Sequence, residues 1–337
     1  MTDLCKSDNA LLNVKNLKVY FSTPTGLAYA VDGISFFIHS GESIALVGES
    51  GCGKSVTALT TLRLLTSPPV EYIDGEVIFH GKNLLKFSEE ELMKIRGRYI
   101  SMVFQEPTSS MNPVFRVGDQ IADVLKYHYG MSKEESYLRI EKLFEWVGIP
   151  EPKIRIHQYP HEFSGGLIQR SMIAMALACE PELLIADEPT TALDVTIQAE
   201  ILALLRRVQQ ERKMSLLLIS HDLSVVAQIA RWIVVLYAGK KVEEGSATAI
   251  YSMPMHPYTK ALFDSLPLRS RGKKRLNTIP GTVPSATNPP AGCRFHPRCP
   301  KAMKICQQKE PPWLWLNKEQ GTACWLYVHS ENVEKET

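Results

Sequence analysis

A glycine-rich segment near residue 50 has the residue types and the spacing of a phosphate-binding loop. It fits G-x-x-x-x-G-K-S with Gly48, Glu49, Ser50, Gly51, Cys52, Gly53, Lys54 and Ser55. An apolar run (43–47) precedes it and helical spacing (57–65) follows it, and strand–loop–helix is the context in which this motif binds phosphate. Glycines let backbone N–H groups turn toward phosphate oxygens, and a helix N-terminus adds a positive dipole. We therefore expect Lys54 to reach the β- and γ-phosphates of a nucleotide and Ser55 to ligate Mg²⁺, with Val56 completing the binding residues.

Two carboxylates follow a second apolar run. Residues 183–186 are Leu-Leu-Ile-Ala, and Asp187 and Glu188 come next. At the end of a buried strand, Asp187 is expected to join the Mg²⁺ shell, and Glu188 to face the γ-phosphate and polarise an attacking water. Taken alone, the pattern also fits a strand that ends in solvated acids. A phosphate loop upstream favours the catalytic interpretation.

Between these motifs, Ser164, Gly165 and Gly166 open a helical stretch. Exposed N–H groups and a hydroxyl at a helix start can bind an anion. By itself the run also fits an ordinary N-capped helix. Two phosphate-facing helix starts in one chain predict that this one serves the nucleotide of another molecule.

The elements around these motifs alternate between helices and buried strands, which indicates a parallel sheet in an α/β domain. Residues 11–39 are rich in Val, Phe, Ile and Tyr and predict a small antiparallel strand region. Capping boxes predict two helix starts, one at Ser88 with Glu91 and one at Ser132 with Glu135.

Over roughly residues 11–250 the chain resembles the ATP-binding subunit of an ATP-binding cassette (ABC) transporter. Six motifs carry the resemblance in order: the phosphate loop, Gln105 within Val103-Phe104-Gln105-Glu106-Pro107, Ser164-Gly165-Gly166, Asp187-Glu188, Ala192-Leu193-Asp194 and Ser220-His221-Asp222. The resemblance implies an ATPase in which Glu188 is the general base and His221 holds the γ-phosphate. Gln105 would contact Mg²⁺ or water and link the site to the membrane subunits.

The resemblance also implies roles in the nucleotide-bound dimer. Phe21 would stack on adenine, with its neighbour Tyr20 as the alternative. Ser164 and Gly166 would bind the γ-phosphate held by the partner ATPase, and Asp194 would bridge the dimer.

The end of the chain is similar to the oligopeptide/dipeptide importer subfamily. The runs that carry this similarity are His256-Pro257-Tyr258-Thr259-Lys260-Ala261-Leu262, Ile279-Pro280-Gly281 and Cys293-Arg294-Phe295-His296-Pro297-Arg298-Cys299-Pro300. The similarity implies a peripheral subunit at the cytoplasmic face of the cell (inner) membrane. Its partners would be a homologous second ATPase, two membrane permeases and a periplasmic or extracellular substrate-binding protein. An importer for nickel or another substrate is the alternative, because such importers share this tail.

Four of the seven cysteines fall in the last 45 residues: Cys293, Cys299, Cys306 and Cys324. Their spacing is not the C-x₂-C of common zinc ribbons, whereas four irregularly spaced thiolates can hold a [4Fe–4S] cluster. Zinc and unliganded thiols remain the alternatives. The subfamily resemblance favours the cluster.

The family resemblance implies the architecture of a P-loop NTPase. An ABC nucleotide-binding domain over residues 1–250 would combine a parallel-sheet core, a small antiparallel β subdomain and a helical subdomain over about 107–170. Residues 251–337, rich in proline, would form an irregular C-terminal metal-binding extension.

Composition disfavours several other classes of protein. Hydrophobic residues make up 45% of the 337, which excludes an intrinsically disordered chain. A formal charge of only +2 predicts no nucleic-acid partner. The sequence shows neither a signal peptide nor an apolar run of about 20 residues, so other subunits are expected to span the membrane.

Two other classes of nucleotide enzyme are disfavoured by the motifs. A soluble ABC ATPase of DNA or ribosome processes usually carries a coiled-coil insertion or two cassettes. Here no sustained heptads separate Lys54 from Ser164. A P-loop kinase or GTPase would lack the Ser-Gly-Gly run and His221.

Overall fold

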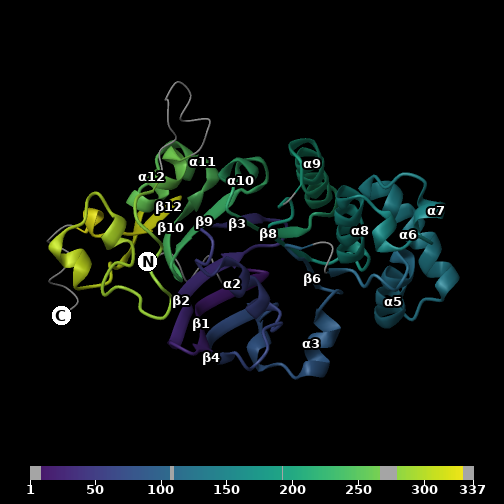
Figure 1. Cartoon of the computed structure of the whole chain (residues 1–337), viewed down its shortest axis with the longest axis horizontal. Coiled ribbons are helices and arrows are strands. Elements are labelled where there is room, and N and C mark those ends of the chain that lie inside the picture. Colours follow the sequence, from purple (N-terminus) through teal and green to yellow (C-terminus); the bar gives the residue numbers. More distant parts are fainter. Residues whose placement is uncertain (1–8, 107–109, 192, 266–278, 329–337) are drawn as a thin grey trace. The chain divides into compact units, whose positions relative to one another are not determined.

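The computed structural model describes residues 9–106, 110–191, 193–265 and 279–328, which fall into two compact units (Figure 1). Unit 1 comprises Met1–Ile38, Ile44–Leu85 and Ser220–Thr337, and unit 2 comprises His39–Ser43 and Lys86–Ile219. Ala192 and the first residues of the predicted helical subdomain lie outside the described residues. The predicted domain boundary near residue 250 stays a prediction.

An antiparallel sheet in unit 1 confirms the strands predicted near the N-terminus. Its order is β2 (Gly26–Ile38), β1 (Leu12–Thr23), β4 (Val70–Phe79) and β5 (Lys82–Asn83). Along β1, Leu12 and Val14 are fully buried, and so are Leu17 and Val19. Alternate side chains of a strand point to the same face, and the register shift between Val14 and Leu17 brings the second pair back to the buried face.

A second group of strands in unit 1 carries the phosphate loop. Strand β3 (Ser43–Val47) pairs in parallel with β9 (Trp232–Tyr237), which pairs antiparallel with β10 (Lys240–Ser246). The helix after the loop, α2 (Lys54–Thr61), begins and ends earlier than the spacing over 57–65 predicts. The other helical elements of unit 1 are α10 (Leu223–Ile229), α11 (Ala247–Ser252), α12 (Pro257–Asp264), η1 (Leu84–Lys86), η4 (His296–Arg298), η5 (Lys304–Gln307) and η6 (Trp325–Tyr327).

The expectation of an irregular extension is wrong for part of it. Strands β11 (Trp313–Asn317) and β12 (Gln320–Ala323) form a hairpin, and β12 pairs antiparallel with β10 (Figure 1). Glycine at position 321 leaves room for the Trp313 ring within the hairpin, because a Cβ there would lie 2.8 Å from Cζ2 of Trp313. The described residues between 279 and 312 form only short 3₁₀ turns and loops, as the prolines predict.

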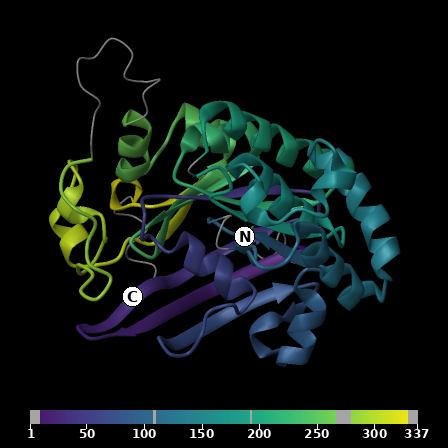
Figure 2. The same ribbon diagram turned by 45° about the vertical axis from the view of Figure 1, so that its right-hand side comes forward.

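Unit 2 contains a parallel sheet in the order β8 (Ser215–Ser220), β7 (Leu183–Asp187), β6 (Ile100–Val103). Every residue of β7 and β8 is buried, which is typical of parallel strands covered on both faces. The helical elements are α3 (Glu89–Ile95), α5 (Val117–Tyr129), α6 (Lys133–Val147), α7 (Pro152–Arg155), η2 (Pro160–Glu162), α8 (Gly165–Leu177) and α9 (Val195–Arg212). Helices α5, α6 and α8 pack on one another, in teal in Figure 2.

Both predicted capping boxes are present. Ser88 caps α3 with Glu91 as its reciprocal partner, and Ser132 caps α6 with Glu135. No helix among the described residues is both long and apolar enough to cross a bilayer.

Candidate functional site

The phosphate loop connects buried strand β3 to helix α2 and depends on its glycines. Gly48 and Gly53 have φ of 151° and 101°. A Cβ at Gly48 would lie 2.2 Å from the carbonyl oxygen of Leu236, and one at Gly53 would lie 2.5 Å from that of Ala30. Only glycine therefore lets the loop pass this close to neighbouring backbone.

Lys54 lies inside the loop that it is expected to serve. Its side chain is buried, and its ammonium donates to the carbonyl oxygens of Gly48 (2.8 Å) and Glu49 (3.1 Å). No side chain caps the N-terminus of α2 at Gly53. The Lys54 ammonium and the N-terminus of α2, which has no side-chain cap, thus lie in the same loop. This arrangement is suited to binding phosphate.

Two residues that sequence reasoning missed contact this loop. The Tyr258 hydroxyl accepts a hydrogen bond from the Glu49 backbone N–H (2.8 Å), and the Arg298 guanidinium holds the Glu49 carboxylate (2.7 Å). Their only signal in the sequence was their place in the runs His256–Leu262 and Cys293–Pro300.

The two candidates for adenine stacking differ in their surroundings. Tyr20 donates its hydroxyl to Asp32 (2.8 Å), and its ring stacks on Tyr72 with centroids 5.1 Å apart. Burial and the Asp32 contact raise the pKa of Tyr20 above its usual range. Phe21, half-buried, is the next residue of β1, and successive side chains of a strand point to opposite faces.

In unit 2 the structure brings Gln105 and Glu188 together. The Gln105 amide donates to a Glu188 carboxylate oxygen (3.2 Å), and the hydroxyl of Thr191 donates to the same oxygen (2.9 Å). Glu188 has φ of 46°, and its N–H donates to the carbonyl oxygen of Ile219 on β8. Buried Asp187 ends β7 one residue earlier. Sequence reasoning found three of these side chains and missed Thr191.

The Ser-Gly-Gly run opens α8, as predicted. The Ser164 side chain caps the helix through a long contact with the Leu167 N–H (3.4 Å). A Cβ on Gly166 would lie 3.0 Å from Cγ2 of Ile197 on α9, so the two helix starts lie close together. Asp194 caps α9 and accepts from the N–H groups of Thr196 and Ile197, both at 3.0 Å.

The remaining predicted residue, His221, lies in unit 1. It is exposed and directly follows β8, and Asp222 caps α10 just after it. The predicted residues thus form two groups. Unit 1 holds the phosphate loop and His221, and unit 2 holds Gln105, the Ser-Gly-Gly run, the two carboxylates and Asp194.

The four late cysteines line one small pocket, together with side chains such as Phe295 and Trp325. All four are free thiols. Burial raises the pKa of Cys293 and Cys324 to about 11 and raises that of Cys299 as well. No group of three or more His, Cys, Asp or Glu side chains within the described ranges is arranged to hold a metal ion.

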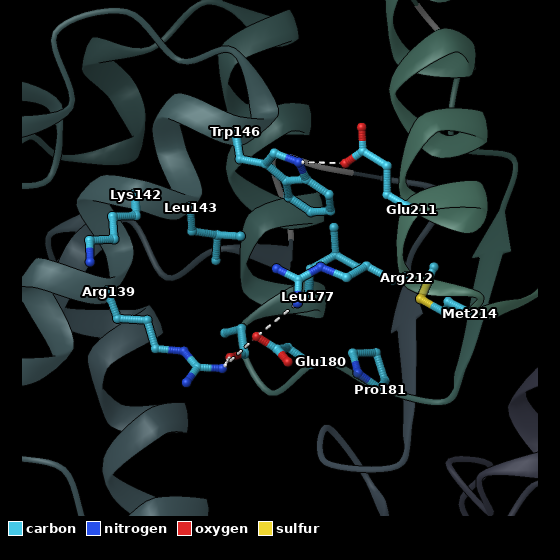
Figure 3. A pocket seen from close by; sticks show the side chains of 11 residues that line it. Arg139, Lys142, Leu143, Trp146, Leu177, Glu180, Pro181, Glu211, Arg212 and Met214 are labelled. Carbon is cyan, nitrogen blue, oxygen red and sulfur yellow. Dashed lines mark hydrogen bonds and ion pairs between the residues drawn. The ribbon is translucent and has the colours of Figure 1, made fainter.

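A larger pocket of about 490 Å³ lies in unit 2, among α6, α9 and the end of α8 (Figure 3). Glu180 pairs with both Arg139 (3.4 Å) and Arg212 (3.2 Å), and the Trp146 indole donates to Glu211 (3.1 Å). Its two arginines are thus already paired, and none of the predicted site residues lines it.

The chain is similar to known families and proteins over nearly its whole length. Residues 31–191 match the family "ABC transporter", and residues 242–306 match "Oligopeptide/dipeptide transporter, C-terminal region". A probable peptide ABC transporter ATP-binding protein of Sinorhizobium fredii is 47% identical over 94% of both chains. The oligopeptide transport ATP-binding protein OppD of Bacillus subtilis is 48% identical over 94% of this chain and 88% of its own. Among solved structures, a dimeric ATP-binding cassette in a post-hydrolysis state with ADP and Pi covers 70% of this chain and 98% of its own, with a TM-score of 0.63 and 27% identity.

Proposed function

This chain belongs to the ABC transporter family and is one of its ATPases, and from that premise we propose that it energises the import of di- or oligopeptides. One observation carries the proposal. Relatives that are 46–48% identical over 94–95% of the chain are named as peptide, oligopeptide or dipeptide transport ATP-binding proteins. The match of residues 242–306 to the C-terminal region of such transporters supports the same substrate class.

The proposed assembly contains this subunit, a homologous second ATPase, two membrane permeases and an external substrate-binding protein. The chain would be peripheral, at the cytoplasmic face of the membrane. The relatives are named as transport ATP-binding proteins, and the similar cassette is dimeric, which supports this arrangement.

In the proposed reaction, the phosphate loop binds ATP through its N–H groups and Lys54. Ser55, Gln105 and Asp187 provide oxygen ligands for Mg²⁺, the donor type that this ion prefers. Glu188 accepts a proton from the attacking water. The contact between Gln105 and Glu188 supports their joint action at one reaction centre.

The remaining roles concern the second subunit and the base. Ser164 and Gly166 contact the γ-phosphate held by the partner, and Asp194 bridges the dimer. His221 holds the γ-phosphate in its own site. Phe21 stacks on adenine, since Tyr20 is already engaged with Asp32 and Tyr72.

A [4Fe–4S] cluster in the extension is the second part of the proposal. Its support is the donor set, because four thiols share one pocket that apolar side chains also line and none of the described lining residues is acidic. With their pKa raised, at least three of these cysteines are neutral thiols at pH 7, so binding would release protons. The cluster would stabilise the extension.

Uptake by cells tests the substrate class. A strain that lacks only this subunit should lose uptake of a labelled dipeptide or oligopeptide and regain it when the chain is restored. Loss of nickel uptake with peptide uptake intact would contradict the proposal and support the alternative.

Metal content tests the cluster separately. Protein purified without oxygen should be brown and carry about four irons per chain. The Cys293→Ser variant should be colourless, whereas Cys179→Ser, a buried cysteine outside the pocket, should keep the colour. One zinc per chain, or no metal at all, would overturn the cluster assignment.

A further inference from the structure

A buried arginine of the C-terminal extension reaches the phosphate loop. Two nitrogens of Arg298 contact the two carboxylate oxygens of Glu49, at 2.7 and 3.1 Å. Parallel contacts of this kind are the strong, directional form of a charge pair. The Arg298 side chain is 4% exposed and that of Glu49 is 26% exposed, so solvent screens the pair only partly.

The arginine is itself held in place within unit 1. Its Nε donates to the carbonyl oxygen of Pro280 (2.9 Å). Nη1, one of the two nitrogens that contact Glu49, also donates to the Tyr237 hydroxyl (3.3 Å). The hydrogen bond with Glu49 is the main cause that raises the pKa of Arg298, so the guanidinium is charged at every accessible pH.

Glu49 is fixed at its backbone as well as at its carboxylate. Its N–H donates to the Tyr258 hydroxyl (2.8 Å), and its carbonyl oxygen accepts from Lys54 (3.1 Å). The start of the phosphate loop is therefore held by two residues more than 200 positions away in the sequence.

The charge of Glu49 explains why this contact matters. The loop receives a polyanion, and a carboxylate within that loop repels it. The repulsion grows with each phosphate and is stronger where water is partly excluded. A guanidinium on both carboxylate oxygens cancels that charge and holds it in one orientation.

We propose that Arg298 is a positioning residue for ATP binding, which neutralises Glu49 and fixes the first turn of the phosphate loop. The inference rests on ATP occupying this loop. In this role Arg298 acts through Glu49 and not by binding the nucleotide itself.

Nucleotide affinity measured on the purified full chain tests the proposal. Dissociation constants for ATP, ADP and AMP are determined by equilibrium dialysis for the wild type, Arg298→Ala, Glu49→Gln and the double variant. Arg298→Ala should weaken ATP binding by about tenfold or more and AMP binding much less, because uncompensated Glu49 repels each phosphate. Adding Glu49→Gln removes that charge and should bring ATP affinity back to that of Glu49→Gln alone.

A neighbouring arginine provides the matched control. Arg294 is also buried and pairs with Asp32 instead of the loop. Any loss of affinity in Arg294→Ala should be similar for ATP and AMP, and Glu49→Gln should not reverse it. Arg298→Lys keeps the charge but not the paired contact, and should show a smaller loss with the same dependence on phosphate number.

Three results would overturn the inference. They are wild-type ATP affinity in Arg298→Ala, an equal loss for ATP and AMP, and a double variant as weak as Arg298→Ala. If Arg298→Ala does not fold, Arg298→Lys with and without Glu49→Gln decides by the same criteria. A wild-type chain that binds no ATP would instead contradict the proposed function.

Discussion

Replacing Glu188 by glutamine removes the proposed general base but keeps a side chain of the same size and shape. One carboxylate oxygen of Glu188 accepts from both Gln105 (3.2 Å) and Thr191 (2.9 Å). A glutamine oxygen can accept both hydrogen bonds in the same position, so the variant should fold and bind ATP like the wild type. The amide cannot take a proton from water.

The expected size of the effect follows from this substitution. General-base catalysis contributes about 10²–10⁴-fold, or about 2.7–5.5 kcal/mol of the barrier. The Glu188→Gln transporter should therefore lose that much ATP hydrolysis and accumulate the ATP-bound dimer. Phosphate release from the reconstituted complex and retention of labelled ATP measure the two quantities.

Thr191→Val is the matched control, because it removes one donor to Glu188 and leaves the carboxylate. A hydrogen bond to a charged group contributes about 1.5 kcal/mol, so hydrolysis should fall only about tenfold. Near-normal turnover in Glu188→Gln, with ATP binding intact, would refute the assignment of the base. An equal loss in both variants would mean that orientation of the loop matters more than proton transfer.

Three further outcomes are expected. Burial lowers the pKa of His256 to about 3, so an unfolded chain takes up a proton that the folded chain cannot. This contribution to folding stability is fully present above pH 6.5 and falls by about 1.4 kcal/mol per pH unit below it. In His256→Asn the side chain can still accept a hydrogen bond from the Tyr258 N–H. The variant should therefore show a flatter pH dependence of urea unfolding between pH 6.5 and 5. Gly321→Val should crowd the Trp313 ring, cost about 1–3 kcal/mol and expose the C-terminal hairpin to proteases, and unchanged proteolysis would contradict the packing. Ser164→Arg should leave ATP binding to the isolated chain intact and abolish hydrolysis in the assembled transporter, and lost binding in the isolated chain would place Ser164 in its own site.

Sequence patterns over a few neighbouring residues predicted the elements that those same residues determine. The helix starts at Ser88 and Ser132 are confirmed, because a capping box depends only on residues within a run of four. The strands predicted from the apolar runs 43–47 and 183–186 are confirmed, because strands buried on both faces are largely apolar; the second strand extends by one residue to Asp187.

The hairpin of β11 and β12 shows where such rules fail. Residues 313–317 read Trp-Leu-Trp-Leu-Asn, without the alternation of apolar and polar residues that signals a strand. Their strand state depends on pairing with β12, which itself pairs with β10, and on the space that Gly321 leaves for Trp313. Neither condition is visible in the local sequence.

The same division holds for the candidate site. Motif spacing predicts the phosphate loop, Gln105 and Glu188, since each lies in a short run of characteristic residues. Thr191 and Arg298 belong to the site only through contacts in the folded chain, and Arg298 lies 249 positions from its partner Glu49. Residues this far apart in the sequence share no local periodicity that could reveal their contact.

The two glutamates of the site are held in ways that match opposite tasks. One oxygen of Glu188 accepts hydrogen bonds from an amide and a hydroxyl, two neutral donors that orient it without compensating its charge. A base needs that charge to accept a proton. Glu49 is held by a guanidinium, which compensates its charge within the loop that we propose binds phosphate. Neutral donors can thus orient a carboxylate for the proposed reaction, whereas a paired guanidinium compensates one that would otherwise repel the substrate.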